Sequence, residues 1–221
     1  MKLPEFLAVI FDMDGLVLDT EKTYGIAWQK AIVEMGYEFT EDFCYSLSGL
    51  QANAMEQRML DFYGIDFDLK LFNNLSGKYW REYVNVHGIP VKKGFFNLLD
   101  ILKTKKIPYC LATNSHKENA YECLQLANLK DVFSCVITRD DVQLGKPAPD
   151  IFLLAAKVLN QPVSKCLVLE DSLTGIKAAY QAGCNTAFIP SVFPIDLATT
   201  RLANYTFNNF DDVALLLRNG N

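Results

Sequence analysis

The sequence has very few histidines and no closely spaced cysteine pair. Only 2 of its 221 residues are histidine, and His87 and His116 lie far apart in the chain. The 6 cysteines include no pair with the CxxC spacing. Cys110, Cys135 and Cys166 fall in apolar, strand-like runs, so we expect small buried side chains there. These features argue against a histidine-based metal site, a zinc cluster and a disulfide framework.

Long apolar runs and an excess of positive charge are also missing. Stretches such as Phe6–Phe11 are far too short to span a bilayer. The formal net charge of −5 argues against nucleic acid as a partner. The first residues show no signal-peptide cleavage pattern, so we expect a cytoplasmic protein with no membrane contact. The hydrophobic content of 50% is ample for a core, and the length suits one large domain or a core with a smaller insert.

The stretch Leu7–Gly15 is the most informative part of the sequence. A short, continuously apolar run ends at two aspartates, Asp12 and Asp14. Such a run is typical of a strand buried on both faces of a parallel sheet, and ligands bind at the carboxyl ends of such strands. Neighbouring carboxylates repel each other unless a proton or a cation relieves them, and Mg²⁺ prefers oxygen ligands. A plain polar turn is the alternative that this stretch alone leaves open.

Helical periodicity dominates residues 21–86, and helices alternate with strands after that block. The first block predicts helices at residues 21–35, 41–47, 52–63 and 68–84. The second predicts helices at 95–102, 117–127, 146–159, 173–182 and 211–217, and strands at 108–112, 132–138, 166–169 and 186–189. Strands that alternate with helices indicate a parallel sheet, so the predicted fold class is α/β. We expect a core of residues 1–18 and 89–221 and an inserted helical domain of residues 19–88.

Polar groups follow three of the predicted strands. They are Asp12 with Asp14, Thr113 with Asn114, and Glu170 with Asp171, while Lys146 opens an intervening helix. Taken singly, each has a plainer explanation, as a helix cap, a first-turn acid or a solvated lysine. Because parallel strands end at the same edge of a sheet, the ordered set favours one shared site. Ser172 is expected to cap the helix that follows it.

The acidic residues suit phosphoryl transfer. Asp12 can attack phosphorus and form a covalent aspartyl intermediate. Asp14 can protonate the leaving oxygen and later deprotonate water. The candidate metal ligands are Asp12, Asp14, Asp171 and Glu170, with Glu170 either a ligand or a partner of one.

The remaining polar groups suit a bound phosphate. Lys146 can place a positive charge beside a phosphate oxygen and beside Asp12. The Thr113 hydroxyl and the Asn114 backbone N–H can hold other phosphate oxygens near a helix N-terminus. Phosphoryl transfer depends mainly on such positioning and on charge neutralisation.

The ordered set resembles the haloacid dehalogenase-like superfamily of phosphohydrolases. The matching stretches are Asp12-Met13-Asp14-Gly15, Ala112-Thr113-Asn114, Gly145-Lys146-Pro147-Ala148-Pro149-Asp150 and Glu170-Asp171-Ser172. The resemblance implies a Rossmann-like parallel-sheet core, Mg²⁺, an aspartyl-phosphate intermediate and a mobile α-helical cap. The place of the helical block is similar to the caps of the β-phosphoglucomutase-like subgroup. True haloacid dehalogenases lack the second aspartate, so Asp14 argues against that chemistry.

Within this subgroup the sequence resembles the phosphatases more than the mutases. Sugar phosphomutases carry a cap histidine about where Tyr24 stands and an arginine about where Ala52 stands. The stretch Asp12–Glu21 is similar to sugar-phosphate and pseudouridine-5′-phosphate phosphatases. The leading hypothesis is therefore a Mg²⁺-dependent phosphatase, monomeric, acting on a small phosphorylated metabolite. A β-phosphoglucomutase-like phosphomutase is the alternative, and a binding module without turnover is a third reading.

Four residues of the helical block are candidates for choosing the substrate. They are Tyr24, Gly49, Gln51 and Ala52. We expect them to lie nearest the leaving group when the cap closes. For Tyr24 an equal alternative is that it packs in the apolar stripe of its helix.

Overall fold

The structure is a computed structural model that describes residues 5–47, 50, 52–191 and 195–219. It divides the chain into two compact units. One unit, called the core unit here, comprises Met1–Leu18 and Pro90–Asn221. The other, called the helical unit, comprises Asp19–Ile89.

The core unit contains a six-stranded parallel sheet with the order β3-β2-β1-β4-β5-β6. The strands are β1 (Ala8–Phe11), β2 (Tyr109–Ala112), β3 (Val136–Ile137), β4 (Cys166–Glu170), β5 (Asn185–Phe188) and β6 (Tyr205–Thr206). In the middle of the sheet, Ile10 pairs with Cys110 on one side and Val168 on the other. The order reverses between β1 and β4, and the carboxyl ends at such a point form the usual ligand site of an open α/β sheet. The predicted α/β class is confirmed.

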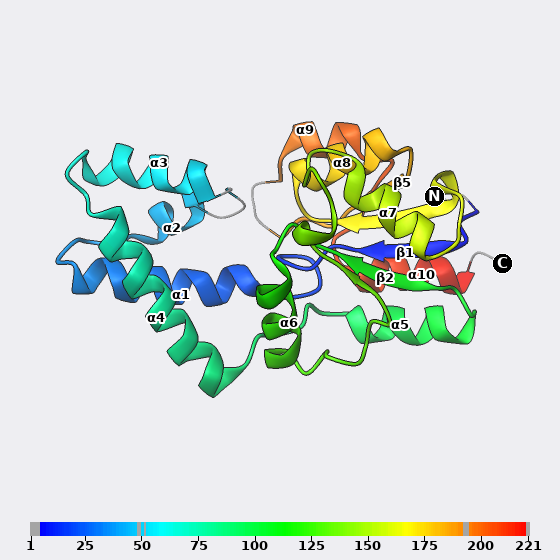
Figure 1. Ribbon diagram of the computed structural model, residues 1–221, viewed down its shortest axis with the longest axis horizontal. Coiled ribbons are helices and arrows are strands. Elements are labelled where there is room, and N and C mark those ends of the chain that lie inside the picture. Colours follow the sequence, from blue (N-terminus) through cyan, green and yellow to red (C-terminus); the bar gives the residue numbers. More distant parts are fainter. Residues whose placement is uncertain (1–4, 48–49, 51, 192–194, 220–221) are drawn as a thin grey trace. The chain divides into compact units, whose positions relative to one another are not determined.

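Helices cover both faces of this sheet (Figure 1). They are α5 (Phe95–Thr104), α6 (Lys117–Leu126), α7 (Asp150–Val158), α8 (Leu173–Ala182), α9 (Leu197–Leu202) and α10 (Phe210–Asn219), with short 3-10 turns η1 (Arg139–Asp141) and η2 (Val163–Lys165). Ile10 belongs to an apolar cluster with residues of α7 and α8. Phe11 instead contacts the rings of Phe95 on α5 and Phe210 on α10. Successive side chains of β1 are thus buried on opposite faces, which explains its continuously apolar sequence.

In its described residues, the helical unit has four helices around its own apolar core. They are α1 (Thr20–Glu34), α2 (Glu41–Leu47), α3 (Ala52–Tyr63) and α4 (Leu69–His87). Its buried core includes Ile32, Phe43, Met59, Phe67 and Phe72. Among the described residues, no helix is both long enough and apolar enough to cross a membrane.

The two chain connections between the units leave the core unit side by side. Leu18 and Val91 form an isolated antiparallel bridge. The backbone N–H of Lys92 donates to the carbonyl of Val17 at 2.9 Å. The exit and the return of the inserted segment are therefore held together a few residues after Asp14.

Several predicted elements differ from the structure. The strand expected at 132–138 is reduced to Val136–Ile137, because Val132 closes a turn on Leu129 and Phe133 packs its ring against Phe11. The helix expected from Lys146 begins only at Asp150. Helix α9 and strand β6 were not predicted; both are short, and β6 is defined only by its pairing with β5.

Candidate active site

A buried lysine lies between two carboxylates at the carboxyl end of the sheet. Asp12 follows β1 and Glu170 ends β4, and both are almost fully buried. The ammonium of Lys146 donates to Asp12 Oδ1, to Glu170 Oε1 at 2.7 Å and to the carbonyl of Ala112 at 3.0 Å. All three ammonium protons are thus used within the protein. The plain reading of Lys146 as a solvated residue is wrong.

The charges in this cluster are not balanced. Burial raises the pKa of Asp12 well above its usual value; Lys146 opposes the shift, and the charges of Glu170 and Asp14 add to it. Burial alone would lower the pKa of Lys146, but Asp12 and Glu170 raise it above its usual value. Lys146 is therefore a permanent cation. It faces two carboxyl groups, so ionisation of both would leave an excess of negative charge that a further cation would relieve.

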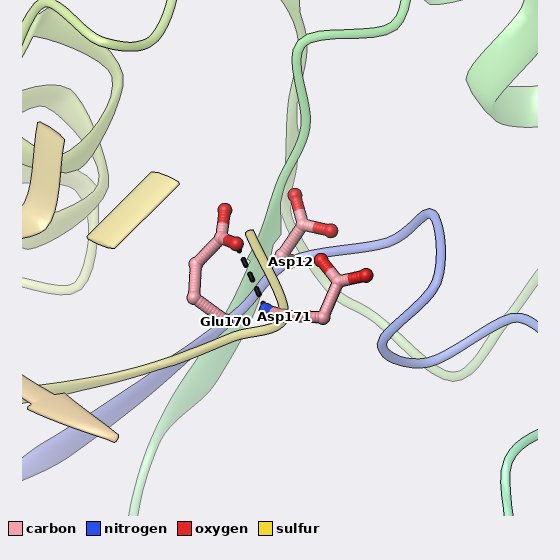
Figure 2. A group of neighbouring side chains, drawn as sticks. All are labelled: Asp12, Glu170 and Asp171. Carbon is pink, nitrogen blue, oxygen red and sulfur yellow. Dashed lines mark hydrogen bonds between the residues drawn. The ribbon is translucent and has the colours of Figure 1, made fainter. Parts of the chain in front are cut away.

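Glu170 is fixed by bonds to the protein at both of its oxygens. Besides the bond from Lys146 to Oε1, its Oε2 accepts from the backbone N–H groups of Asp171 and Ser172 and from the Ser172 hydroxyl, each at 2.9 Å. Figure 2 shows the bond from Asp171. A Cβ atom at Gly175, in the first turn of α8, would collide with this carboxylate. Glycine at position 175 therefore leaves room for the buried Glu170.

Asp12, Glu170 and Asp171 form a group that could hold a metal ion (Figure 2). Each offers one carboxylate oxygen, and these three oxygens lie within 4.8 Å of one another. An all-oxygen set of negative charge fits a hard divalent cation. Because Glu170 is already bonded at both oxygens, Asp12 and Asp171 are the better donors. Gly15, at φ +78°, lies against the Asp171 carboxylate, where a Cβ would clash.

Asp14 has a different environment from Asp12, Glu170 and Asp171. Within the described chain it is not a member of that group. It is half-buried, and its Oδ2 accepts a hydrogen bond from the hydroxyl of Ser115 at 2.8 Å. Sequence reasoning missed Ser115. The local signal for it is its place two residues after Thr113, because a threonine hydroxyl commonly accepts from the backbone N–H two residues later. The Ser115 N–H does donate to the Thr113 hydroxyl oxygen, at 3.0 Å.

Thr113 and Asn114 follow β2 and do not cap the next helix, whose N-cap is His116. Thr113 is buried, and its backbone N–H bonds to the carbonyl of Ile137 at 2.9 Å. The side chain of Asn114 holds the backbone of Lys146 by two bonds, accepting from its N–H at 2.8 Å and donating to its carbonyl at 3.1 Å. Asn114 therefore positions Lys146, a role that its sequence context did not reveal.

Of the four substrate-choosing candidates, one has described side-chain contacts. The ring of Tyr24 stacks on Trp28 and on Trp80, with centroids 6.0 and 5.6 Å apart. These contacts, all within the helical unit, support the packing alternative for Tyr24. Gly49 and Gln51 lie outside the described residues, and Ala52 is the first residue of α3.

Comparisons with known proteins agree with this architecture. The family model described as haloacid dehalogenase-like hydrolase matches residues 9–189. A phosphorylated carbohydrates phosphatase of Thermotoga maritima is 33% identical over 80% of this chain and 81% of its own length. A probable pseudouridine-5′-phosphatase of Drosophila melanogaster is 32% identical over 82% of this chain and 80% of its own. The crystal structure of a HAD hydrolase, family IA, variant 3, from Entamoeba histolytica has a TM-score of 0.76 at 27% identity and covers 96% of this chain and 99% of that one.

Proposed function

The chain belongs to the haloacid dehalogenase-like hydrolases and is a phosphatase, and on that premise we propose that it hydrolyses small phosphorylated metabolites with the help of Mg²⁺. The observation that carries the proposal is the buried Lys146 between Asp12 and Glu170, with Asp171 beside them. A buried group of this charge is costly to maintain for structure alone. Perturbed ionisable groups at the ligand edge of a sheet are typical of a catalytic centre.

In the first step, Asp12 attacks phosphorus and the bond from phosphorus to the ester oxygen breaks. The product is an aspartyl-phosphate on Asp12. Asp14 gives its proton to the departing ester oxygen. Lys146 keeps a positive charge beside Asp12, which favours the ionised carboxylate that the attack requires. The Asn114 N–H has no partner among the described residues, and with the Thr113 hydroxyl it is suited to bind phosphate oxygens.

In the second step, water attacks the same phosphorus atom. Asp14, ionised after the first step, takes the proton of that water. The bond between phosphorus and Asp12 breaks, inorganic phosphate leaves and the Asp12 carboxylate is restored. One residue thus acts as acid and then as base, which returns the enzyme to its starting state.

Asp12 and Asp171 would hold Mg²⁺, with Asp14 and Glu170 as the other candidates from the sequence. When bound, the ion would neutralise negative charge among the carboxylates and the phosphate. Protein groups already donate hydrogen bonds to Glu170, which favours a role as a partner of the metal ligands and not as a ligand itself. From that position it would orient both Lys146 and the backbone of Asp171.

We propose that the helical unit selects the substrate. Its two connections are paired at Leu18 and Val91, close in sequence to Asp14. Motion at such paired connections is a common way to control access to a site. The two relatives act, by their names, on phosphorylated carbohydrates and on pseudouridine 5′-phosphate, so sugar phosphates and nucleoside-like monophosphates are the substrates to examine first.

The test is a panel of such compounds, assayed for release of inorganic phosphate with Mg²⁺ present. Mg²⁺-dependent release from one or more of them, at a kcat/KM well above that for 4-nitrophenyl phosphate, would support the proposal. Conversion of β-glucose 1-phosphate to glucose 6-phosphate without net release would favour the phosphomutase alternative. Binding without turnover across the panel would contradict both enzyme readings.

A further inference from the structure

One hydrogen bond joins the general acid–base residue to a different loop of the core unit. The hydroxyl of Ser115, after β2, donates to Asp14 Oδ2 at 2.8 Å across 101 positions of sequence. Neither residue belongs to a regular helix or strand. The bond is therefore a specific contact between two strand-end loops.

Ser115 is held on both sides of its own backbone. Its N–H donates to the Thr113 hydroxyl oxygen at 3.0 Å, and its carbonyl accepts from the N–H of Arg139 at 3.0 Å. The Arg139 guanidinium in turn donates to the carbonyl of Val142 at 2.9 Å. The Ser115 hydroxyl is thus presented by a well-anchored turn.

The backbone around Asp14 is also fixed, but that does not set the direction of its carboxyl group. Gly15 N–H donates to the carbonyl of Leu18 at 2.9 Å, and the carbonyl of Met13 accepts from Val17 and Leu18. These bonds set the position of the Asp14 Cα. The bond from Ser115 to Oδ2 restricts rotation about the side-chain bonds of Asp14.

We propose that Ser115 is a positioning residue for Asp14 in the phosphatase reaction. Its hydroxyl holds Oδ2 and so orients the carboxyl group for proton transfer to the leaving oxygen and from water. The inference rests on the proposed function, because it assigns Asp14 the acid–base role. Proton transfer depends steeply on the geometry of donor and acceptor, so a loose Asp14 would act poorly as an acid.

Esters with different leaving groups distinguish a role in orienting Asp14 from a general structural role of Ser115. A sugar alkoxide is a poor leaving group and needs a proton, whereas 4-nitrophenolate leaves without much help. Ser115→Ala should lower kcat/KM, which reports the step in which the leaving group departs, about tenfold to a hundredfold on a sugar phosphate that the wild type hydrolyses, but only a few-fold on 4-nitrophenyl phosphate. Hydrolysis of the aspartyl-phosphate is the same step for both esters and also uses Asp14, so a loss of kcat that arises in that step should be shared by both. Ser115→Thr, which keeps the hydroxyl, should restore most of the lost rate.

Two further variants complete the experiment. Asp14→Asn is the reference and should show the same selective loss to a larger extent. Ser134→Ala, at an exposed serine before β3, is the matched control and should behave as the wild type.

Other outcomes would contradict the role of Ser115, the role of Asp14 or the proposed function. Equal losses of kcat/KM on both esters, or a rise in KM with kcat unchanged, would show that Ser115 supports the fold or binds substrate and would overturn the proposal. Failure of Ser115→Thr to recover the rate, with the protein folded by circular dichroism, would do the same. If Asp14→Asn showed the same loss of kcat/KM on both esters, the acid role of Asp14 would be wrong. If the wild type released no phosphate from either ester, the proposed function would be wrong.

Discussion

Glu170 accepts a hydrogen bond at 2.7 Å from the ammonium group of Lys146, 24 positions earlier in the chain. The same ammonium bonds to Asp12, so one cation serves two buried carboxylates. The lysine therefore stabilises the core unit and, at the same time, the ionised form of the proposed nucleophile. A change at Lys146 should therefore affect both the stability of the protein and the reactivity of Asp12.

Replacement of Lys146 by Met should destabilise the protein by about 3–5 kcal/mol at neutral pH, because it leaves buried carboxylates without their partner. Activity should be lost with it. The deficit should shrink as pH falls, since Asp12, whose pKa burial raises, can then take up a proton and lose its unpaired charge. Urea unfolding at pH 8 and pH 5 measures both effects.

A matched control for that variant is available at the surface. Lys165 forms an exposed ion pair with Glu5 at 3.2 Å. Lys165→Met should change the free energy of unfolding by less than about 1 kcal/mol. A Lys146→Met protein as stable as this control at both pH values would contradict the assigned role of Lys146.

Asp12→Asn should abolish phosphate release and leave the fold intact. The amide is close to the carboxylate in shape but cannot attack phosphorus as an anion. Glu170 and the Ala112 carbonyl still hold Lys146 in this variant. Steady-state phosphate assays and circular dichroism check both statements, and turnover within tenfold of wild type would count against Asp12 as nucleophile.

Chelation of divalent cations should remove activity, and Ca²⁺ should replace Mg²⁺ poorly because it favours looser coordination. Asp171→Ala should weaken Mg²⁺ binding, measured by calorimetry, more than Glu170→Ala does. Glu170→Ala should instead lower the free energy of unfolding, since it removes a partner of Lys146. Unchanged activity in excess chelator would exclude the metal from the mechanism, and equal Mg²⁺ affinities of the two variants would contradict the ranking of the ligands.

Tyr24→Ala should change the ranking of substrates by kcat/KM more than it changes hydrolysis of 4-nitrophenyl phosphate. Tyr24→Phe separates the two readings of this residue, because it keeps the ring stacked on Trp28 and Trp80 and removes only the hydroxyl. Gln51→Ala is expected to alter the ranking as well. A ranking left untouched by all three substitutions would refute the role of the helical unit in specificity.

Asp196→Ala should destabilise the core unit by about 0.5–2 kcal/mol at pH 7, because Asp196 caps α9. The Thr199 hydroxyl and the Ala198 N–H donate to its carboxylate and lower its pKa below the usual value. A depressed folded pKa means that this contribution is full above about pH 4 and is lost as pH falls through the folded pKa. Thermal unfolding should therefore show a gap between wild type and variant that narrows on acidification, and a constant gap would refute the ionised cap.

Local patterns in the sequence were enough to predict the class of fold and most of its elements. The continuously apolar β1, the helical period of α1 and α3, and the stop of α8 at Gly183 each depend on residues within a few positions of one another. The N-cap role of Ser172 was predictable for the same reason and is confirmed by its bond from Gly175. Short elements such as β6 escaped prediction because their pairing partner, not their own sequence, defines them.

The sequence by itself determined which chemical groups follow which strands, since that is a matter of order along the chain. Only the tertiary structure decided their pairing: Lys146 with Asp12 and Glu170, Asn114 with the backbone of Lys146, and Ser115 with Asp14. These contacts join residues 24 to 134 positions apart. They depend on the order of strands in the sheet and on how the intervening loops close, and no local propensity encodes either.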